Sequence, residues 1–196
     1  LTLVLMVWAR WQLPDFAGEP ASKRLGLHHV LALPGIRPVL WVTFTYVLAH
    51  NILYTYIAPL LVPAGIGSGI DRVLLVFGLA ALLSLWLVGI WIDRHLRLMT
   101  FISCTMFAVA AVLLGLWLSS AIIIYVSVAL WGLAFGGLPA LLQTALAKSA
   151  GNSADAAQSM LVTVWNLGIA GGGLAGGLLL QRGGVVVFPW AVFGLM

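Results

Sequence analysis

The chain has 196 residues, of which 63% are hydrophobic and only 7% are charged. Soluble domains have roughly 45–50% apolar and about 25% charged residues, so these side chains cannot cover a water-facing surface. This composition excludes a soluble globular domain. The net charge of +4 does not indicate nucleic-acid binding, because the basic residues are scattered between apolar runs and form no stripe.

The chain opens with a short apolar segment, residues 1–11, which closes on Arg10 and Trp11. As a helix, eleven residues would cover about 16 Å of a hydrocarbon core about 30 Å thick. The segment lacks an initiator methionine, a basic N-terminal region and a small-residue cleavage site, so it is not a signal peptide. We expect it to be the end of a transmembrane helix in a natural protein that extends beyond both ends of this chain.

Residues 12–37 form a polar linker. They include Pro14, Pro20 and Pro34 together with charges of both signs. This mixture is typical of a flexible tether between two membrane-embedded parts. We therefore interpret residues 12–37 as a flexible tether.

Five apolar runs follow, and each is long enough to cross a bilayer, which takes about 20 helical residues. They cover residues 39–62, 72–92, 98–118, 121–147 and 156–180, and a shorter run covers 185–196. We predict that residues 38–196 form an all-α, polytopic membrane bundle. With residues 1–11, the chain would hold five whole spans and two partial ones.

The basic residues between the runs predict the orientation of the bundle. Seven of them fall on the side of the linker (Arg10, Lys23, Arg24, Arg37, Arg94, Arg97 and Lys148), and two fall on the other side (Arg72 and Arg182). Loops rich in Lys and Arg stay in the cytoplasm. The linker is therefore predicted to be cytoplasmic.

Small residues recur every four positions in the last two whole runs. Gly168, Gly172 and Gly176 share one helix face, and Gly132, Gly136 and Ala140 share another. Without bulky side chains, two helix backbones can approach closely along such a face. We expect both sets to be helix-packing seams. The overlapping pattern G-x-G-x-x-G at 171–176 does not predict a dinucleotide site, because it lies inside a helix with no acidic residue after it.

His50 is the ionisable residue nearest the centre of a predicted span. Tyr46 and Tyr54 lie four residues on either side of it, so the three side chains form one polar and aromatic stripe. Three interpretations stay open. The stripe could line a substrate cavity, His50 could exchange protons because histidine titrates near physiological pH, or it could be a packed, hydrogen-bonded side chain.

Two further polar side chains, Gln143 and Asn166, lie in the fourth and fifth spans. A polar group in a dry medium needs a partner. We place both with Tyr46, His50 and Tyr54 as candidates for the cavity wall. For Asn166, a bond to a neighbouring helix is the alternative, since it shares its helix with the glycine seam.

The sequence contains no combination of residues that would support catalysis. H-E-x-x-H, G-K-[ST] and the G-x-S-G of intramembrane serine proteases are all missing, and the single Cys104 provides no disulfide or metal framework. We expect neither an enzyme nor a bound metal or cofactor.

Three stretches together resemble bacterial transporters of the major facilitator superfamily, in the twelve-span drug–proton antiporter branch that includes sugar, nucleoside and drug exporters. Residues 34–40 and 49–59 resemble helix seven, and Asn166-Leu167-Gly168 resembles helix eleven. Residues 89–97 are similar to the cytoplasmic signature G-x-x-x-D-R-x-G-R, carried here by Gly89, Asp93, Arg94 and Arg97. Leu96 stands where the signature has its second glycine, so we expect the loop there to depart from the family's tight geometry.

The resemblance implies the C-terminal six-helix half of such a transporter, with residues 1–11 ending helix six and residues 185–196 beginning helix twelve. It implies efflux of a small organic molecule by proton antiport across the bacterial inner membrane, by alternating access with an N-terminal half. Asp93, Arg94 and Arg97 would form a cytoplasmic latch. The alternative is a non-transporting membrane module or an inactive, truncated half-transporter.

Overall fold

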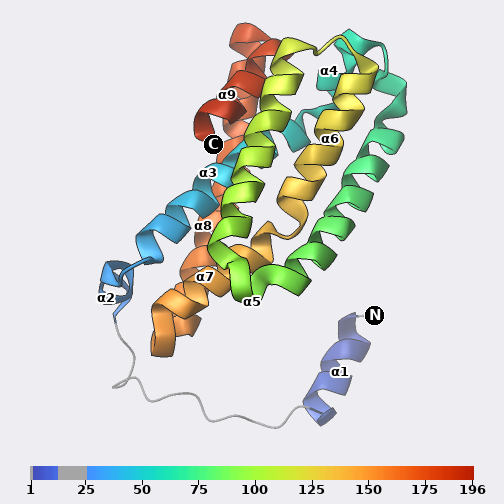
Figure 1. The fold of residues 1–196 in the computed structure, drawn as a ribbon. Coiled ribbons are helices and arrows are strands. Elements are labelled where there is room, and N and C mark those ends of the chain that lie inside the picture. The colour runs from blue at the N-terminus through green and yellow to red at the C-terminus, as the bar shows by residue number, and fades with distance from the viewer. Residues whose placement is uncertain (1, 13–25) are drawn as a thin grey trace.

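The computed structural model describes residues 2–12 and 26–196, and all regular structure in these residues is helical (Figure 1). The α-helices are α1 (Thr2–Gln12), α2 (Leu27–Ala32), α3 (Ile36–Thr55), α4 (Ile57–Leu61), α5 (Ile70–Leu116), α6 (Ala121–Gly136), α7 (Leu138–Ala150), α8 (Ala154–Gly183) and α9 (Phe188–Leu195). Short 3₁₀ turns join some of them: η2 (Val62–Ala64), η3 (Gly67–Gly69), η4 (Gly151–Ser153) and η5 (Val185–Val187).

Helix α5 is too long for a single crossing. Its 47 residues would extend about 70 Å as a straight helix, more than twice the thickness of a hydrocarbon core. His95 has non-helical backbone angles (φ −131°, ψ 30°), and the helix folds back there into two arms, with α6 between them in Figure 1. The connection predicted between the second and third spans is therefore a sharp bend in a nearly continuous helix. Neither glycine nor proline interrupts residues 90–98, which explains why the helix resumes at once.

The first span is bent as well. Helices α3 and α4 meet at Tyr56, and α3 makes an angle of 66° with residues 57–64. Pro59 explains the bend, because proline has no N–H to donate to the carbonyl of Thr55 and its ring collides with that carbonyl. The break turns the end of the span away from the axis of α3.

By length and composition, two continuous helical stretches of the described residues could cross a membrane, and a third could if the bent pair is one span. The two stretches are Gly67–Leu116 and Ala121–Gly183, and each holds a reversal: at His95 in the first and at η4 in the second (Figure 1). The described part of the chain is thus all-helical, with apolar helices long enough to cross a membrane. The number of five whole and two partial spans stays a prediction.

Part of the linker is folded. Val30 of α2 and Ile36 at the start of α3 are both 0% exposed, and they pack in one cluster with Leu146, Ala157 and Leu161 of α7 and α8. The prediction of a tether is therefore wrong for residues 26–37, because their polar average hides several apolar side chains that find a hydrophobic contact. The rest of the predicted tether, residues 13–25, lies outside the described residues.

Two helix pairs make close contact through glycine. On α8, a Cβ added to Gly168 would lie 2.9 Å from Val47 Cβ, and one added to Gly176 would lie 2.6 Å from Tyr56 Cε2. On α6, a Cβ added to Gly132 would lie 2.5 Å from the backbone oxygen of Phe77 on α5. These glycines let α8 approach α3, and α6 approach α5, at backbone distance.

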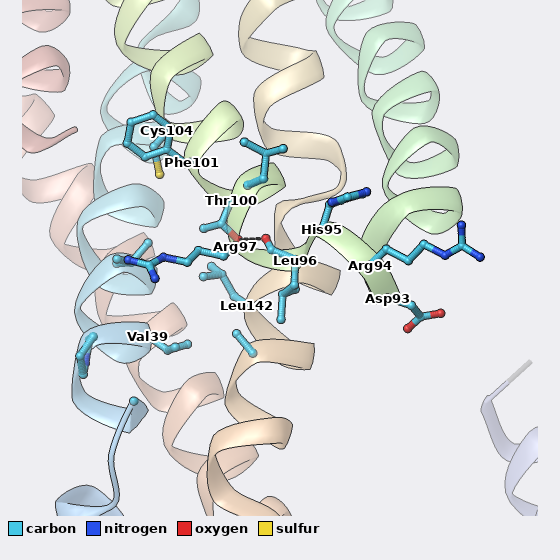
Figure 2. Close-up of a pocket in the computed structure, with 15 residues that line it drawn as sticks. Val39, Asp93, Arg94, His95, Leu96, Arg97, Thr100, Phe101, Cys104 and Leu142 are labelled. Carbon is cyan, nitrogen blue, oxygen red and sulfur yellow. Dashed lines mark hydrogen bonds between the residues drawn. The ribbon is translucent and has the colours of Figure 1, made fainter.

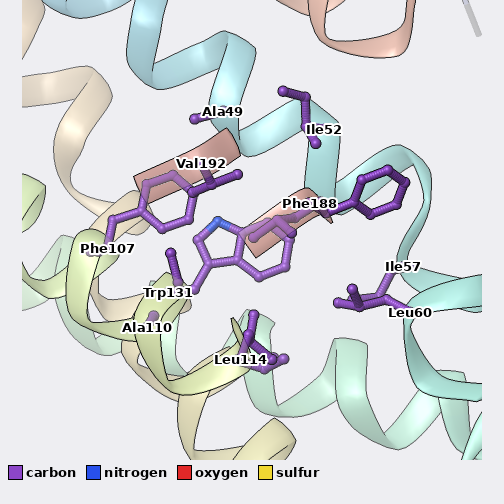
Figure 3. Packing of buried hydrophobic residues seen from close by; sticks show 14 of the residues in the cluster. Ala49, Ile52, Ile57, Leu60, Phe107, Ala110, Leu114, Trp131, Phe188 and Val192 are labelled. Carbon is purple, nitrogen blue, oxygen red and sulfur yellow. The ribbon is translucent and has the colours of Figure 1, made fainter. Parts of the chain in front are cut away.

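The largest apolar cluster lies between these pairs. Trp131 of α6 is 0% exposed and is surrounded by side chains of α3, α5 and α9, among them Ala49, Phe107 and Val192 (Figure 3). This core fixes the position of the indole ring.

Candidate substrate-binding site

His50 of α3 lies at the centre of a group of aromatic rings. Its ring stacks on Phe135 of α6, with centroids 3.6 Å apart and an angle of 11° between the planes. Tyr54, one turn along α3, stacks on His50 at 5.3 Å. Trp131 Nε1 donates a hydrogen bond of 3.1 Å to His50 Nδ1. We call the set His50, Tyr54, Phe77, Trp131 and Phe135 the aromatic cluster.

Other helices complete its surroundings. Phe77 of α5 lies 5.9 Å from His50 and 4.7 Å from Trp131, measured between ring centroids. Trp165 of α8 lies 6.3 Å from Phe135. Four helices thus bring rings to one place. Sequence reasoning missed Phe77 and Phe135, although the four-residue spacing of Trp131 and Phe135 placed both on one helix face.

The cluster is buried at one end and open at the other. Trp131 is 0% exposed and His50 is 7% exposed, whereas Tyr54 is 45% exposed. Tyr46, the third member of the predicted stripe, is 0% exposed; its ring packs on Phe107 and its hydroxyl lies 3.5 Å from the backbone oxygen of Ser103. Tyr46 therefore lies beneath the open face, and Tyr54 lies on it.

Gln143 and Asn166, also predicted for the cavity wall, are exposed and lie on α7 and α8. The amide of Asn166 donates to the carbonyl of Val162 on its own helix at 2.8 Å. The backbone oxygen of Gln143 accepts from Gln158 Nε2 at 3.1 Å. Within the described residues, neither side chain is hydrogen bonded to the aromatic cluster, and the alternative of an interhelical bond for Asn166 is not what the structure contains.

The residues of the predicted latch lie at the bend of α5. Gly89, Asp93, Arg94 and Arg97 are all exposed. Figure 2 shows Arg97 extending toward α3, while Asp93 and Arg94 point the opposite way. The bend, the start of α3 and part of α7 line an open pocket of about 1140 Å³.

Comparison with known proteins identifies the family. The sequence profile of the Major Facilitator Superfamily matches residues 1–173, which is most of the chain. The chain belongs to the Major Facilitator Superfamily. The resemblance carried by its motifs is thus confirmed at the level of the family, and the chain is related to membrane transporters rather than to enzymes.

Several relatives of the chain are named purine ribonucleoside efflux pump NepI. The purine ribonucleoside efflux pump NepI of Escherichia coli strain K12 is 29% identical over 185 residues, and so is that of Shigella flexneri. NepI of Escherichia coli O157:H7 is 28% identical over the same length. The matches cover 93% of this chain but 47% of each relative. The chain therefore spans about half the length of these relatives.

Proposed function

We propose that this chain is the C-terminal half of a twelve-helix transporter that exports a small organic molecule across the bacterial inner membrane in exchange for protons. The 47% coverage of NepI supports a missing N-terminal half, because the match takes in 93% of this chain. On this proposal α1 ends helix six, α3 and α4 are helix seven, and the arms of α5 are helices eight and nine. Helices α6 and α7 together are helix ten, α8 is helix eleven and α9 begins helix twelve.

The observation that carries the proposal is the aromatic cluster with its open end at Tyr54. Its rings are stacked, tilted or edge-on at centroid distances of 3.6 to 6.4 Å, an arrangement that a flat aromatic ligand can extend. None of the five members carries a fixed charge. Such a surface suits an uncharged, planar ring with polar edges.

A purine nucleoside has these properties, and NepI is named for exporting purine ribonucleosides. We therefore take purine nucleosides as the first substrates to test. The ring would stack beside Tyr54 and Phe135 where the two halves face each other. Each base stacked on an aromatic side chain is worth about 1–3 kcal/mol.

The coupling proton would be carried by the other half. In the described residues the acidic side chains are Asp71, Asp93 and Asp155, and all three are exposed and near helix ends or at the bend of α5. A proton carrier has to meet the central cavity from both sides of the membrane in turn. None of these three positions meets that requirement.

The bend of α5 would act as a cytoplasmic latch. Since Arg97 and the pair Asp93 and Arg94 point in opposite directions, each would contact a different neighbour: Arg97 across the 1140 Å³ pocket toward α3, and the pair toward the N-terminal half (Figure 2). Contacts of this kind hold one conformation of an alternating-access cycle until substrate shifts the equilibrium.

The test is transport by the complete protein in everted membrane vesicles. Energised vesicles should accumulate radiolabelled adenosine or inosine, and a protonophore should abolish the accumulation. Tyr54→Ala should reduce it severalfold, while Trp86→Phe, at a 64% exposed site on α5 away from the cluster, should leave it unchanged. Correctly inserted protein that moves neither these nucleosides nor other uncharged aromatic solutes would contradict the proposal and favour a non-transporting module.

A further inference from the structure

The hydrogen bond between Trp131 and His50 can form in only one direction. An indole nitrogen is a donor and never an acceptor, so His50 Nδ1 must offer a lone pair at 3.1 Å. An imidazolium has a proton on both nitrogens and could not accept this bond. The contact therefore requires a neutral His50 whose proton is on Nε2.

The surrounding rings hold both partners in place. Trp131 is 0% exposed, and its ring lies 4.7 Å from Phe77 and 6.0 Å from Phe107, nearly parallel to the latter. His50 is held against Phe135 at 3.6 Å. Neither ring can turn without disturbing the core, so the direction of the indole N–H is fixed by packing.

The other nitrogen of His50 is available to a ligand. In the described residues, His50 Nε2 has no hydrogen-bond partner. It is nevertheless not a fully buried polar atom that lacks a partner, since the described side chains contain such an atom at Ser127 Oγ. His50 Nε2 is therefore not sealed in, and the 7% exposure of His50 leaves it reachable. Its N–H is a hydrogen-bond donor at the inner end of the aromatic cluster.

Among the side chains that pack on His50, Trp131 is the one whose hydrogen bond requires the neutral imidazole. The rings on it come from α3 (Tyr54), α5 (Phe77) and α6 (Trp131 and Phe135), and among them only Tyr54 carries a titratable group. The nearest charged residues along these helices are Arg37 on α3, thirteen positions before His50, and Asp71 and Arg72 on α5, six and five positions before Phe77, while α6 carries none. On α8, which approaches Phe135 through Trp165, Asp155 lies ten positions before that ring.

We propose that Trp131 is a positioning residue that keeps His50 a neutral Nε2–H donor, so that the site selects ligands with a hydrogen-bond acceptor on an aromatic ring. This rests on the proposed function and narrows it. His50 takes no part in carrying the proton, because protonation would break its bond to Trp131. A purine ring nitrogen is an acceptor of the required kind.

The first test reads the tautomer directly and needs no substrate. The complete transporter, with ¹⁵N-labelled histidine, is placed in lipid nanodiscs, and the His50 signals are assigned by their loss in His50→Gln. Nitrogen NMR between pH 6 and 8 should show a protonated Nε2 and an unprotonated Nδ1 throughout. A proton on Nδ1, or an imidazolium form in this range, would overturn the proposal even if nucleoside export is established.

The second test asks whether the donor selects an acceptor. Binding of adenosine is compared with that of 1-deaza-, 3-deaza- and 7-deazaadenosine, each of which replaces one ring nitrogen by C–H. In the wild type one analogue should bind about fivefold more weakly than adenosine, the loss of one hydrogen bond. Trp131→Phe keeps an aromatic side chain but removes the N–H donor. In this variant all three analogues should bind within about twofold of adenosine.

Trp86→Phe is the matched control and should keep the wild-type pattern. Equal binding of all four nucleosides to the wild type, or discrimination retained in Trp131→Phe, would overturn the proposal. If Trp131→Phe does not fold, the wild-type comparison and the NMR measurement still decide it. If adenosine does not bind at all, the nucleoside assignment fails, and the NMR measurement alone decides the role of Trp131.

Discussion

Gly172 of α8 lies directly against Asn51 of α3: a Cβ added at this glycine would be 2.5 Å from Asn51 Cβ and 2.7 Å from the backbone oxygen of Leu48. No ordinary carbon contact is that short, so even one methyl group must push α8 away from α3. Its neighbour Gly173 has open space at the same position, with nothing within 4 Å.

This pair gives a matched test of the seam. Gly172→Ala should lower the stability of the purified transporter by about 1–3 kcal/mol, the usual cost of overpacking. Gly173→Ala should leave the melting temperature unchanged or raise it, because alanine favours helix over glycine. The measurement is thermal unfolding in detergent. Equal effects of the two substitutions would mean that the close contact is not maintained in the folded protein.

A second prediction concerns two buried serines. Ser84 Oγ accepts a hydrogen bond of 3.1 Å from the backbone N–H of Gly137, at the break between α6 and α7. Ser127 Oγ is buried without a partner in the described residues. Ser84→Ala should cost about 1–3 kcal/mol, because it leaves the N–H unpaired.

Ser127→Ala is its control and should be neutral or stabilising, because it removes a buried polar atom that has no hydrogen-bond partner in the described residues. Both variants can be compared by the same thermal unfolding measurement. A larger loss for Ser127→Ala than for Ser84→Ala would contradict the hydrogen bonding described here.

Much of the fold follows from the sequence, and the reason is the bilayer. In hydrocarbon every backbone polar group must be paired within the chain, so long apolar runs have to be helices. The described helices accordingly cover the predicted runs, although helix α5 joins two of them and two others are broken at Tyr56 and Gly137. The constraint is weaker outside the apolar runs. There, residues 26–37 are folded where a tether is predicted, and a bend at His95 replaces a predicted loop.

The site was only partly predictable. A four-residue spacing places Tyr46, His50 and Tyr54 on one face of α3, but it does not say where along that face the bundle opens. Tyr46 is buried and packs on Phe107 of the second arm of α5, whereas Tyr54 is 45% exposed. The contribution of Phe135 depends on how α6 packs against α3, which the sequence of neither helix specifies.

The orientation can be tested at two exposed turns. A cysteine replacing Ser68 in η3 should react with an impermeant maleimide added to intact cells, and one replacing Asn152 in η4 should react only after the membrane is opened. Both are placed in a Cys104→Ala background, so that no native thiol of the described residues reports. The reverse pattern would invert the topology and refute the assignment of the α5 bend to the cytoplasmic side.

If the aromatic cluster binds a flat aromatic substrate, its rings should contribute to the equilibrium binding of adenosine by the purified, complete transporter. Phe135→Leu keeps an apolar side chain but removes the ring that stacks on His50 at 3.6 Å, so the dissociation constant should rise about tenfold. The control is Phe193→Leu on α9, where the side chain is 49% exposed, and this variant should have the wild-type dissociation constant. Wild-type affinity in a folded Phe135→Leu protein would mean that the substrate does not bind at the aromatic cluster.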